Sequence, residues 1–159
     1  MGNTSWRQMF VELCEAIFRE LGFSPPEMLH EDALPLAMEL EVGQRSFELI
    51  HSSSDRPEKV LVICHLGPLP NDAGKSHLNA LLSENIRNIR NFRPCFGINA
   101  DSHHVISISY ERLKNCSAIV LLEKMRIFAN DASIWQERVF TPENGFDDHV
   151  AEISGVMLA

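Results

Sequence analysis

The stretch from Ser46 to Pro70, SFELIHSSSDRPEKVLVICHLGPLP, decides the fold of this chain. It contains two apolar runs, Ser46–His51 and Val60–Cys64, separated by a polar segment, which predicts two strands joined by a loop. The stretch ends in the run Gly67–Pro70, which contains two prolines. Proline lacks the amide hydrogen of a sheet ladder and disfavours a helical residue before it. We therefore expect this run to end the second strand and to form a rigid exit from the sheet.

A hairpin is predicted just before this stretch. In residues 36–42, apolar side chains alternate with alanine and glutamate, which is typical of a strand with one apolar face. Gly43-Gln44 can turn the chain back into the next strand. The following run, Val60–Cys64, is apolar on both faces. It is expected to be a central strand, covered on both sides within the domain or on one side by another chain.

Three segments have the three- and four-residue apolar spacing of amphipathic helices. The first is Ser5–Leu21, which Gly22 is placed to end. The second begins near Ala73 and carries its apolar stripe from Leu78 to Ile89. The third is expected from about Asn115 to Val139, with Asn115 or Ser117 as its cap.

Two more strands are predicted between the second and third helices, in Pro94–Ala100 and His104–Tyr110. The order helix, three strands, helix, two strands, helix predicts an α+β fold with a twisted antiparallel sheet flanked by helices. A length of 159 residues suits one domain, here residues 1–139. Residues 140–159 are expected to be a loosely ordered tail or to form a short helix near Val150–Met157.

The charge balance narrows the choice of partners. The chain has 14 basic and 22 acidic residues, a formal net charge of -8. Such a charge repels phosphate backbones, so nucleic acid is not the expected partner, and a basic or amphipathic protein is a better complement. The sequence has no apolar run near the roughly 18 residues of a membrane span and no apolar signal core at its start. We therefore expect a cytosolic protein with no membrane partner.

Catalytic and ligand-binding motifs fail on spacing. Gly74-Lys75-Ser76 is similar to the end of a phosphate-binding loop, but the first glycine of that motif would stand at position 69, which is Leu69. His103 and His104 are the only close histidine pair, and neighbouring strand residues point to opposite faces. No Cys-x-x-Cys pair exists, and the cysteines are expected to be buried small hydrophobes. They are Cys14, Cys64, Cys95 and Cys116. We expect no enzyme activity, no cofactor and no metal.

Several segments resemble the Tir-chaperone (CesT-like) family, the class I chaperones of bacterial type III secretion. Phe47–His51 with the polar loop after it, and Cys64–Pro70, are similar to a strand, loop and Gly-Pro-Leu-Pro exit of that family. Arg93–Asn99 and His104–Ile108 are similar to its fourth and fifth strands. The order of elements, the small size and the acidic balance also match. The resemblance covers roughly Trp6 to Val139.

The resemblance implies a non-enzymatic homodimer in the bacterial cytoplasm. It would bind the N-terminal segment of a secreted effector in extended form and keep it soluble and competent for export. An extended client can pair with a sheet edge and press alternate side chains into apolar grooves. A regulatory or adaptor module of the same fold that binds a folded partner is the alternative, and an α+β enzyme with an unrecognised site is a third, weaker reading.

The resemblance also implies where each partner binds. The first helix and the first strands would bind the client, and they carry more apolar surface than a small sheet with three helices needs. For any one of these residues a place in the core is an equal alternative. The residues expected to contact the client are Phe10, Phe18, Leu36, Met38 and Leu40. The residues of the second helix expected to form the dimer interface are Leu78, Leu81, Leu82, Ile86 and Ile89.

Overall fold

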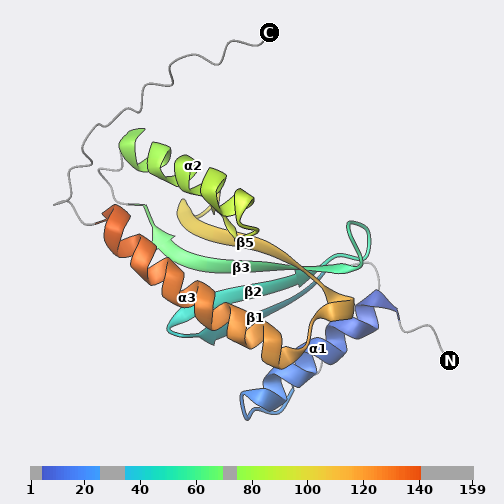
Figure 1. The fold of residues 1–159 in the computed structure, drawn as a ribbon. Coiled ribbons are helices and arrows are strands. Elements are labelled where there is room, and N and C mark those ends of the chain that lie inside the picture. The colour runs from blue at the N-terminus through green and yellow to red at the C-terminus, as the bar shows by residue number, and fades with distance from the viewer. Residues whose placement is uncertain (1–4, 26–34, 70–74, 141–159) are drawn as a thin grey trace, which may run out of the picture.

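A computed structural model describes residues 5–25, 35–69 and 75–140 of the chain. Within them, a five-stranded antiparallel sheet in the order β1-β2-β3-β5-β4 is combined with three α-helices (Figure 1). The elements are α1 (Trp6–Glu20), β1 (Leu36–Val42), β2 (Arg45–His51), β3 (Lys59–Pro68), α2 (Lys75–Arg90), β4 (Cys95–Ile98), β5 (His104–Arg112), a short 3-10 helix (Leu113–Asn115) and α3 (Ala118–Phe140). The predicted α+β fold and element order are confirmed.

The ends of α1 follow from local chemistry. The Ser5 side chain caps its first turn by accepting a hydrogen bond from the Gln8 amide at 3.1 Å. Gly22 follows the last turn with a φ of 80°, a left-handed value that glycine adopts without strain. Between these ends, one face of the helix is buried, with Phe10 and Ile17 among its residues.

The β1–β2 hairpin is formed as predicted. Gly43 and Gln44 have φ values of 58° and 63°, the two positive values of the tight turn whose twist matches paired strands. The pairing runs in register from Leu36 opposite His51 to Val42 opposite Arg45. A Cβ at Gly43 would lie 3.1 Å from the Cβ of Ala129. The glycine therefore serves the turn and also the close approach of α3.

The third strand is central, as predicted, and it ends inside the Gly67–Pro70 run that was expected to end it, although it extends beyond the apolar run Val60–Cys64. β3 lies between β2 and β5 and continues through Gly67 to Pro68. Its pairing with β2 ends at Cys64, so Pro68 has a neighbouring strand on one side only, where a missing amide hydrogen is tolerated. The register shifts between His65 and Gly67, which has a φ of 107°. This irregularity lets the glycine–proline run stay in the sheet.

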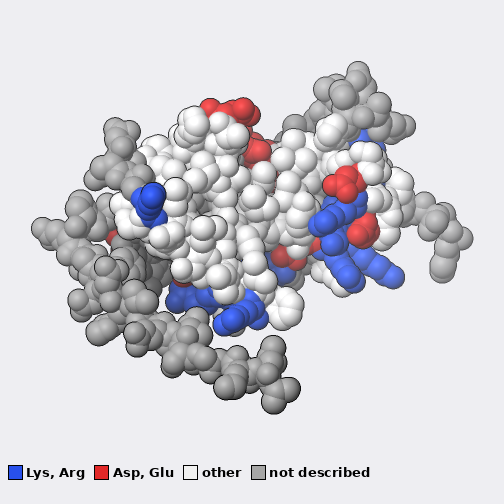
Figure 2. Space-filling model, turned by 90° about the horizontal axis from the view of Figure 1, so that it is seen from above, with Lys and Arg blue, Asp and Glu red and all other residues white. Residues whose placement is uncertain are grey.

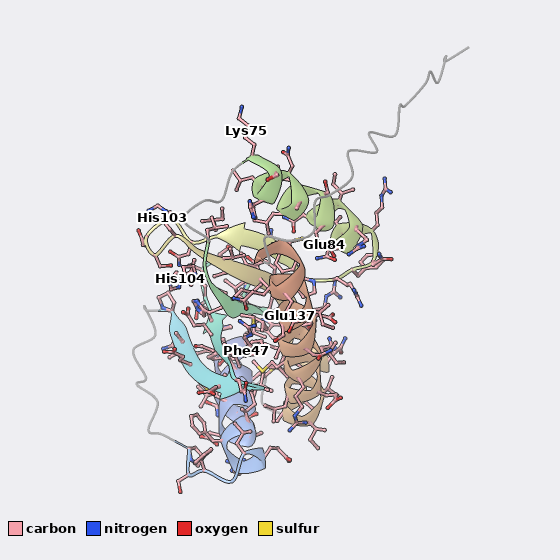
Figure 3. The ribbon with its side chains drawn as sticks, turned by 90° about the vertical axis from the view of Figure 1, so that its left-hand side faces the viewer. Phe47, Lys75, Glu84, His103, His104 and Glu137 are labelled. Carbon is pink, nitrogen blue, oxygen red and sulfur yellow. The ribbon has the colours of Figure 1, made fainter. Side chains whose placement is uncertain are left out.

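One face of the sheet forms the core. α1 and α3 cover this face, while none of the described helices lies on the opposite face (Figures 1 and 3). The ring of Phe47 points into this core (Figure 3). Alternate residues of β1, β2 and β3 supply the buried side chains: Leu36, Met38, Val42, Phe47, Leu49, His51, Val60, Val62, Cys64 and Leu66.

The third helix begins later than predicted. Residues Leu113–Asn115 form a 3-10 turn, and α3 starts at Ala118. Ser117 is the cap, because its carbonyl accepts from Leu121 at 2.9 Å and its hydroxyl from Val120 at 3.4 Å. α3 ends at Phe140. The tail predicted from residue 140, with its possible short helix, lies otherwise outside the described residues.

Candidate partner-binding surfaces

The residues expected to contact a client are mainly core residues. Phe10 is fully buried, and Leu36 and Met38 are only 7% and 6% exposed. Phe18 and Leu40 are half-buried and pack at the margin of the same core. Of the five, only these last two have surface that a partner could contact without unfolding the domain. Most apolar side chains of α1 and β1 therefore belong to the core of the domain and are not available to a partner.

Most of the residues of α2 that were expected at the dimer interface are exposed in the single chain. Leu78, Leu82, Ile86 and Ile89 are 40%, 62%, 57% and 63% exposed, whereas Leu81 is 6% exposed and belongs to the core. The four exposed residues define what we call the α2 stripe. Seen from above, the molecule has a broad area free of charged side chains, with charged groups around it (Figure 2). α2 itself carries Lys75, Glu84, Arg87 and Arg90 in addition to the stripe. A contiguous exposed apolar patch marks an interaction site.

Polar contacts fix α2 to the edge of the sheet. The Asn85 side chain accepts a hydrogen bond from the Phe96 amide at 2.6 Å and donates one to the Phe96 carbonyl at 2.8 Å. The buried Asn88 side chain donates to the Pro94 carbonyl at 2.9 Å. Both asparagines lie on the inner side of α2, so their bonds to the β4 segment hold the α2 stripe outward.

Phe92 is a candidate that the sequence reasoning missed. Its side chain is 99% exposed, and its φ is 54°. It stands in the position after the helix where glycine is usual: the Arg93 amide donates to the Asn88 carbonyl at 2.8 Å and the Phe92 amide to the Ile89 carbonyl at 3.2 Å. A large apolar ring that is both strained and exposed suggests a function. The sequence could have indicated this residue, because a phenylalanine stands just after the second helix, where a glycine usually ends a helix.

A second exposed apolar line lies on α3. Val120, Ile127 and Ile134 are spaced by seven residues and are 48%, 50% and 42% exposed. Ile119, three residues before the buried Leu122, is 65% exposed. The inner stripe is formed by Leu121, Leu122, Met125, Ala129 and Ala132.

The sheet has an open face and a free edge. β1 is an edge strand, and its outer side pairs with no strand in the described parts of the chain. On the face away from α1 and α3, register places Ile50, Leu61 and Tyr110 in one row across three strands. His65 and Glu48 lie on this face too, with His65 Nε2 2.7 Å from a Glu48 oxygen. An edge and an apolar face together suit an extended peptide.

Cys14 and Cys64 are buried, as expected, whereas Cys95 and Cys116 are only half-buried. Burial raises the pKa of the Cys14 thiol to about 12 and that of Cys64 to about 12. Burial, with a smaller effect of the Glu111 charge, raises the pKa of Cys116 to about 11. The described side chains include no group of three or more His, Cys, Asp or Glu that could share a metal ion. Among the helices described, none has the length and apolar character needed to cross a membrane.

Several solved structures share this fold, and chaperone complexes are among them. A chain of the HopA1–SchA chaperone–effector complex matches with a TM-score of 0.62 and 18% identity, over 81% of this chain and 94% of that one. A chain of the ExsC–ExsE complex matches with a TM-score of 0.66 and 14% identity, over 87% and 97%. The Yersinia pestis type III secretion chaperone SycH, in complex with a stable fragment of YscM2, matches with a TM-score of 0.58 and 16% identity, over 79% and 98%.

Neither a protein-family model nor a curated protein matches the sequence. The comparisons therefore establish the fold, which this chain shares with chains of the HopA1–SchA, ExsC–ExsE and SycH–YscM2 complexes. Each alignment covers at least 94% of the neighbour and at most 87% of this chain.

Proposed function

We propose that this chain is a type III secretion chaperone that binds the N-terminal segment of an effector in extended form. The observation that carries the proposal is the fold, which is shared over most of the chain with proteins solved in complex with effectors. The free edge of β1 and the open sheet face support it, because an extended segment can satisfy its backbone hydrogen bonds at a sheet edge. Leu40 belongs to β1 itself, and Leu40 and Phe18 both pack at the margin of the core.

We further propose that two copies associate through α2. The α2 stripe is too exposed and too continuous to be explained by the fold of one copy. In a two-fold dimer both subunits contribute the same surface to the interface. The α2 stripe of one subunit can therefore pack against the α2 stripe of the other. Phe92, at the end of the stripe, is an aromatic side chain, a type that is enriched at the centres of interfaces. Its strained backbone position is consistent with a role in association rather than in folding.

Co-purification tests the client proposal. The chain is expressed with proteins encoded beside its own gene, the complex is isolated, and limited proteolysis is applied. The expected result is a protected fragment from the N-terminal part of one of these proteins. Hydrogen exchange should then show slower exchange of the amides in Leu36–Val42 when the fragment is bound. A bound protein that is globular and protected throughout would favour the adaptor alternative instead.

A further inference from the structure

One end of the open sheet face carries a cluster of cations around a single aromatic ring. The Arg56 guanidinium carbon lies 5.1 Å from the ring centre of Tyr110, and Lys59 Nζ lies 5.8 Å from it. Arg112 is opposite Lys59 in the β3–β5 register. Tyr110 is 48% exposed. We call these four residues the Tyr110 cluster.

Within residues 5–25, 35–69 and 75–140, no carboxylate forms an ion pair with the cations of the cluster. The ion pairs of the described residues involve other cations and leave out Arg56, Lys59 and Arg112. Asp55 and Glu58 are near in sequence, but neither is in an ion pair with the three cations. The chain as a whole has a net charge of -8, so a patch of three cations that form no ion pair with a described carboxylate differs from the rest of the protein.

Two features of the cluster oppose folding. Lys59 and Arg112 are like charges directly opposite each other on neighbouring strands, an arrangement that destabilises a sheet. Arg56 has a φ of 50°, which non-glycine residues rarely adopt, and it precedes Pro57, which favours an extended residue before it. Both features place positive charge at the Tyr110 ring. An anionic ligand at this position would offset the repulsion between the cations.

The surroundings specify the kind of anion. A row of side chains leads away from the cluster across the open face, from Tyr110 through Leu61 and Ile50 to Ala37 at the edge. The next row contains Glu48, which is paired with His65. The face is therefore positive at one end, apolar beside it and acidic further along. A ligand with carboxylates next to apolar side chains matches that order, and a uniformly negative polymer does not.

We propose that the Tyr110 cluster binds the carboxylate side chains of an extended acidic segment in a partner protein, with its apolar side chains on the Leu61–Ile50 row. This deepens the proposed function and rests on it for the identity of the partner, which is the effector client. Lys59 and Arg112 bind the carboxylates, and the Tyr110 ring holds Lys59 and Arg56 in place through cation–π contacts. The cluster thus selects clients that combine acidic and apolar residues.

Short fluorescent peptides test the site directly. One peptide alternates leucine with glutamate, and its two matched controls alternate leucine with glutamine and leucine with lysine. Binding to the full chain is measured by anisotropy at low and high salt. The glutamate peptide is expected to bind most tightly and to lose affinity as salt rises, because exposed charge pairs are screened.

Two variants with the same change of net charge separate the site from general electrostatics. Lys59→Glu removes a cation from the cluster, whereas Lys75→Glu changes an exposed lysine at the start of α2 that points away from the molecule (Figure 3). Lys59→Glu should weaken the glutamate peptide about tenfold, and Lys75→Glu by less than about twofold. Lys59→Glu should also raise the melting temperature of the free chain, because it places a carboxylate opposite Arg112. A residue with only a structural role would lower it.

The outcomes separate this inference from the proposed function. Equal losses in both variants, or tighter binding of single-stranded DNA than of the glutamate peptide, would overturn the acidic-segment site. A synthetic peptide of residues 141–159, which has four acidic residues and no lysine or arginine, is the remaining competitor. If it bound more tightly than every other peptide, the occupant would be this chain's own segment. If an effector co-purified but peptide binding did not depend on Lys59, the acidic-segment site would be rejected and the proposed chaperone function would be kept. If peptide binding depended on Lys59 but no effector co-purified, the proposed chaperone function would be rejected and the peptide site would be kept.

Discussion

The ring of Phe10 on α1 stacks on that of His51 on β2, with ring centres 5.3 Å apart and planes inclined by 19°. Both side chains are fully buried, and His51 Nε2 lies 2.9 Å from the Pro57 carbonyl oxygen. The stack therefore ties α1 to the sheet and to the β2–β3 loop. It also explains why Phe10, which the sequence offered as a client contact, serves the core.

Phe10→Ala should remove this stack and leave a cavity. The expected loss in the free energy of unfolding is about 3–5 kcal/mol, as for other buried phenylalanines. Denaturant unfolding measures it, and Glu20→Ala, at the exposed end of the same helix, is the matched control. Unchanged stability of Phe10→Ala together with lost client binding would return Phe10 to the client surface.

Met38→Asp and Leu40→Asp should separate the core from its margin. Both residues face the same side of β1, but Met38 is buried and Leu40 is half-buried. An unpaired charge at Met38 should prevent folding, whereas Leu40→Asp should fold with reduced stability and bind client about 1–3 kcal/mol more weakly. Thermal melts and client pulldown are the measurements. Full client retention by folded Leu40→Asp would exclude this margin of the core from the client site.

Ile86→Asp should dissociate the proposed dimer without unfolding the monomer. Ile86 is 57% exposed in the single chain, so a charge at this position contacts water in the monomer. In the proposed dimer the same charge would be buried against the apolar surface of the second copy, which is unfavourable. Light scattering should show a monomer with a native circular dichroism spectrum. Leu81→Ala is the contrast, because Leu81 is in the core and its truncation should lower stability by about 2–5 kcal/mol. A folded Ile86→Asp chain that remained dimeric would exclude α2 as the interface.

Phe92→Gly should have opposite effects on folding and on association. Glycine relieves the left-handed backbone at this position, and the monomer should gain about 0.5–1 kcal/mol. The same change removes an exposed ring, so self-association should weaken. Denaturant melts at low concentration report the first effect, and sedimentation over a concentration range reports the second. Equal association of the glycine variant would show that Phe92 lies outside the interface.

Cys14 and Cys64 should be protected in the native state, and the ionisation of their thiols should lower stability only at high pH. Burial raises the pKa values of Cys14 and Cys64 from 9.0 to about 12, so their thiols should react with a disulfide reagent at pH 8 only after unfolding. Above pH 9 the unfolded chain ionises these thiols while the folded chain keeps them neutral. Stability should therefore fall between about pH 9 and 12. A Cys14→Ala, Cys64→Ala variant should show a smaller fall over this range.

Local sequence determined the elements themselves. The Gly43-Gln44 turn, the alternation of residues 36–42 and the end of α1 at Gly22 were all predictable, because each depends on the backbone preferences of neighbouring residues. The central position of β3 could also be inferred from its two apolar faces. Its continuation through Pro68 could not, since it depends on where β2 stops pairing.

Tertiary structure decided which apolar residues became core and which became surface. Met38 and Ile86 both lie on regular apolar stripes, yet α1 and α3 cover the first and nothing in the described chain covers the second. Periodicity shows that a stripe exists, but its burial depends on elements distant in the chain. The Tyr110 cluster has the same origin. Arg56, Lys59 and Arg112 are unremarkable in sequence, and only the pairing of β3 with β5 gathers their charges around one ring.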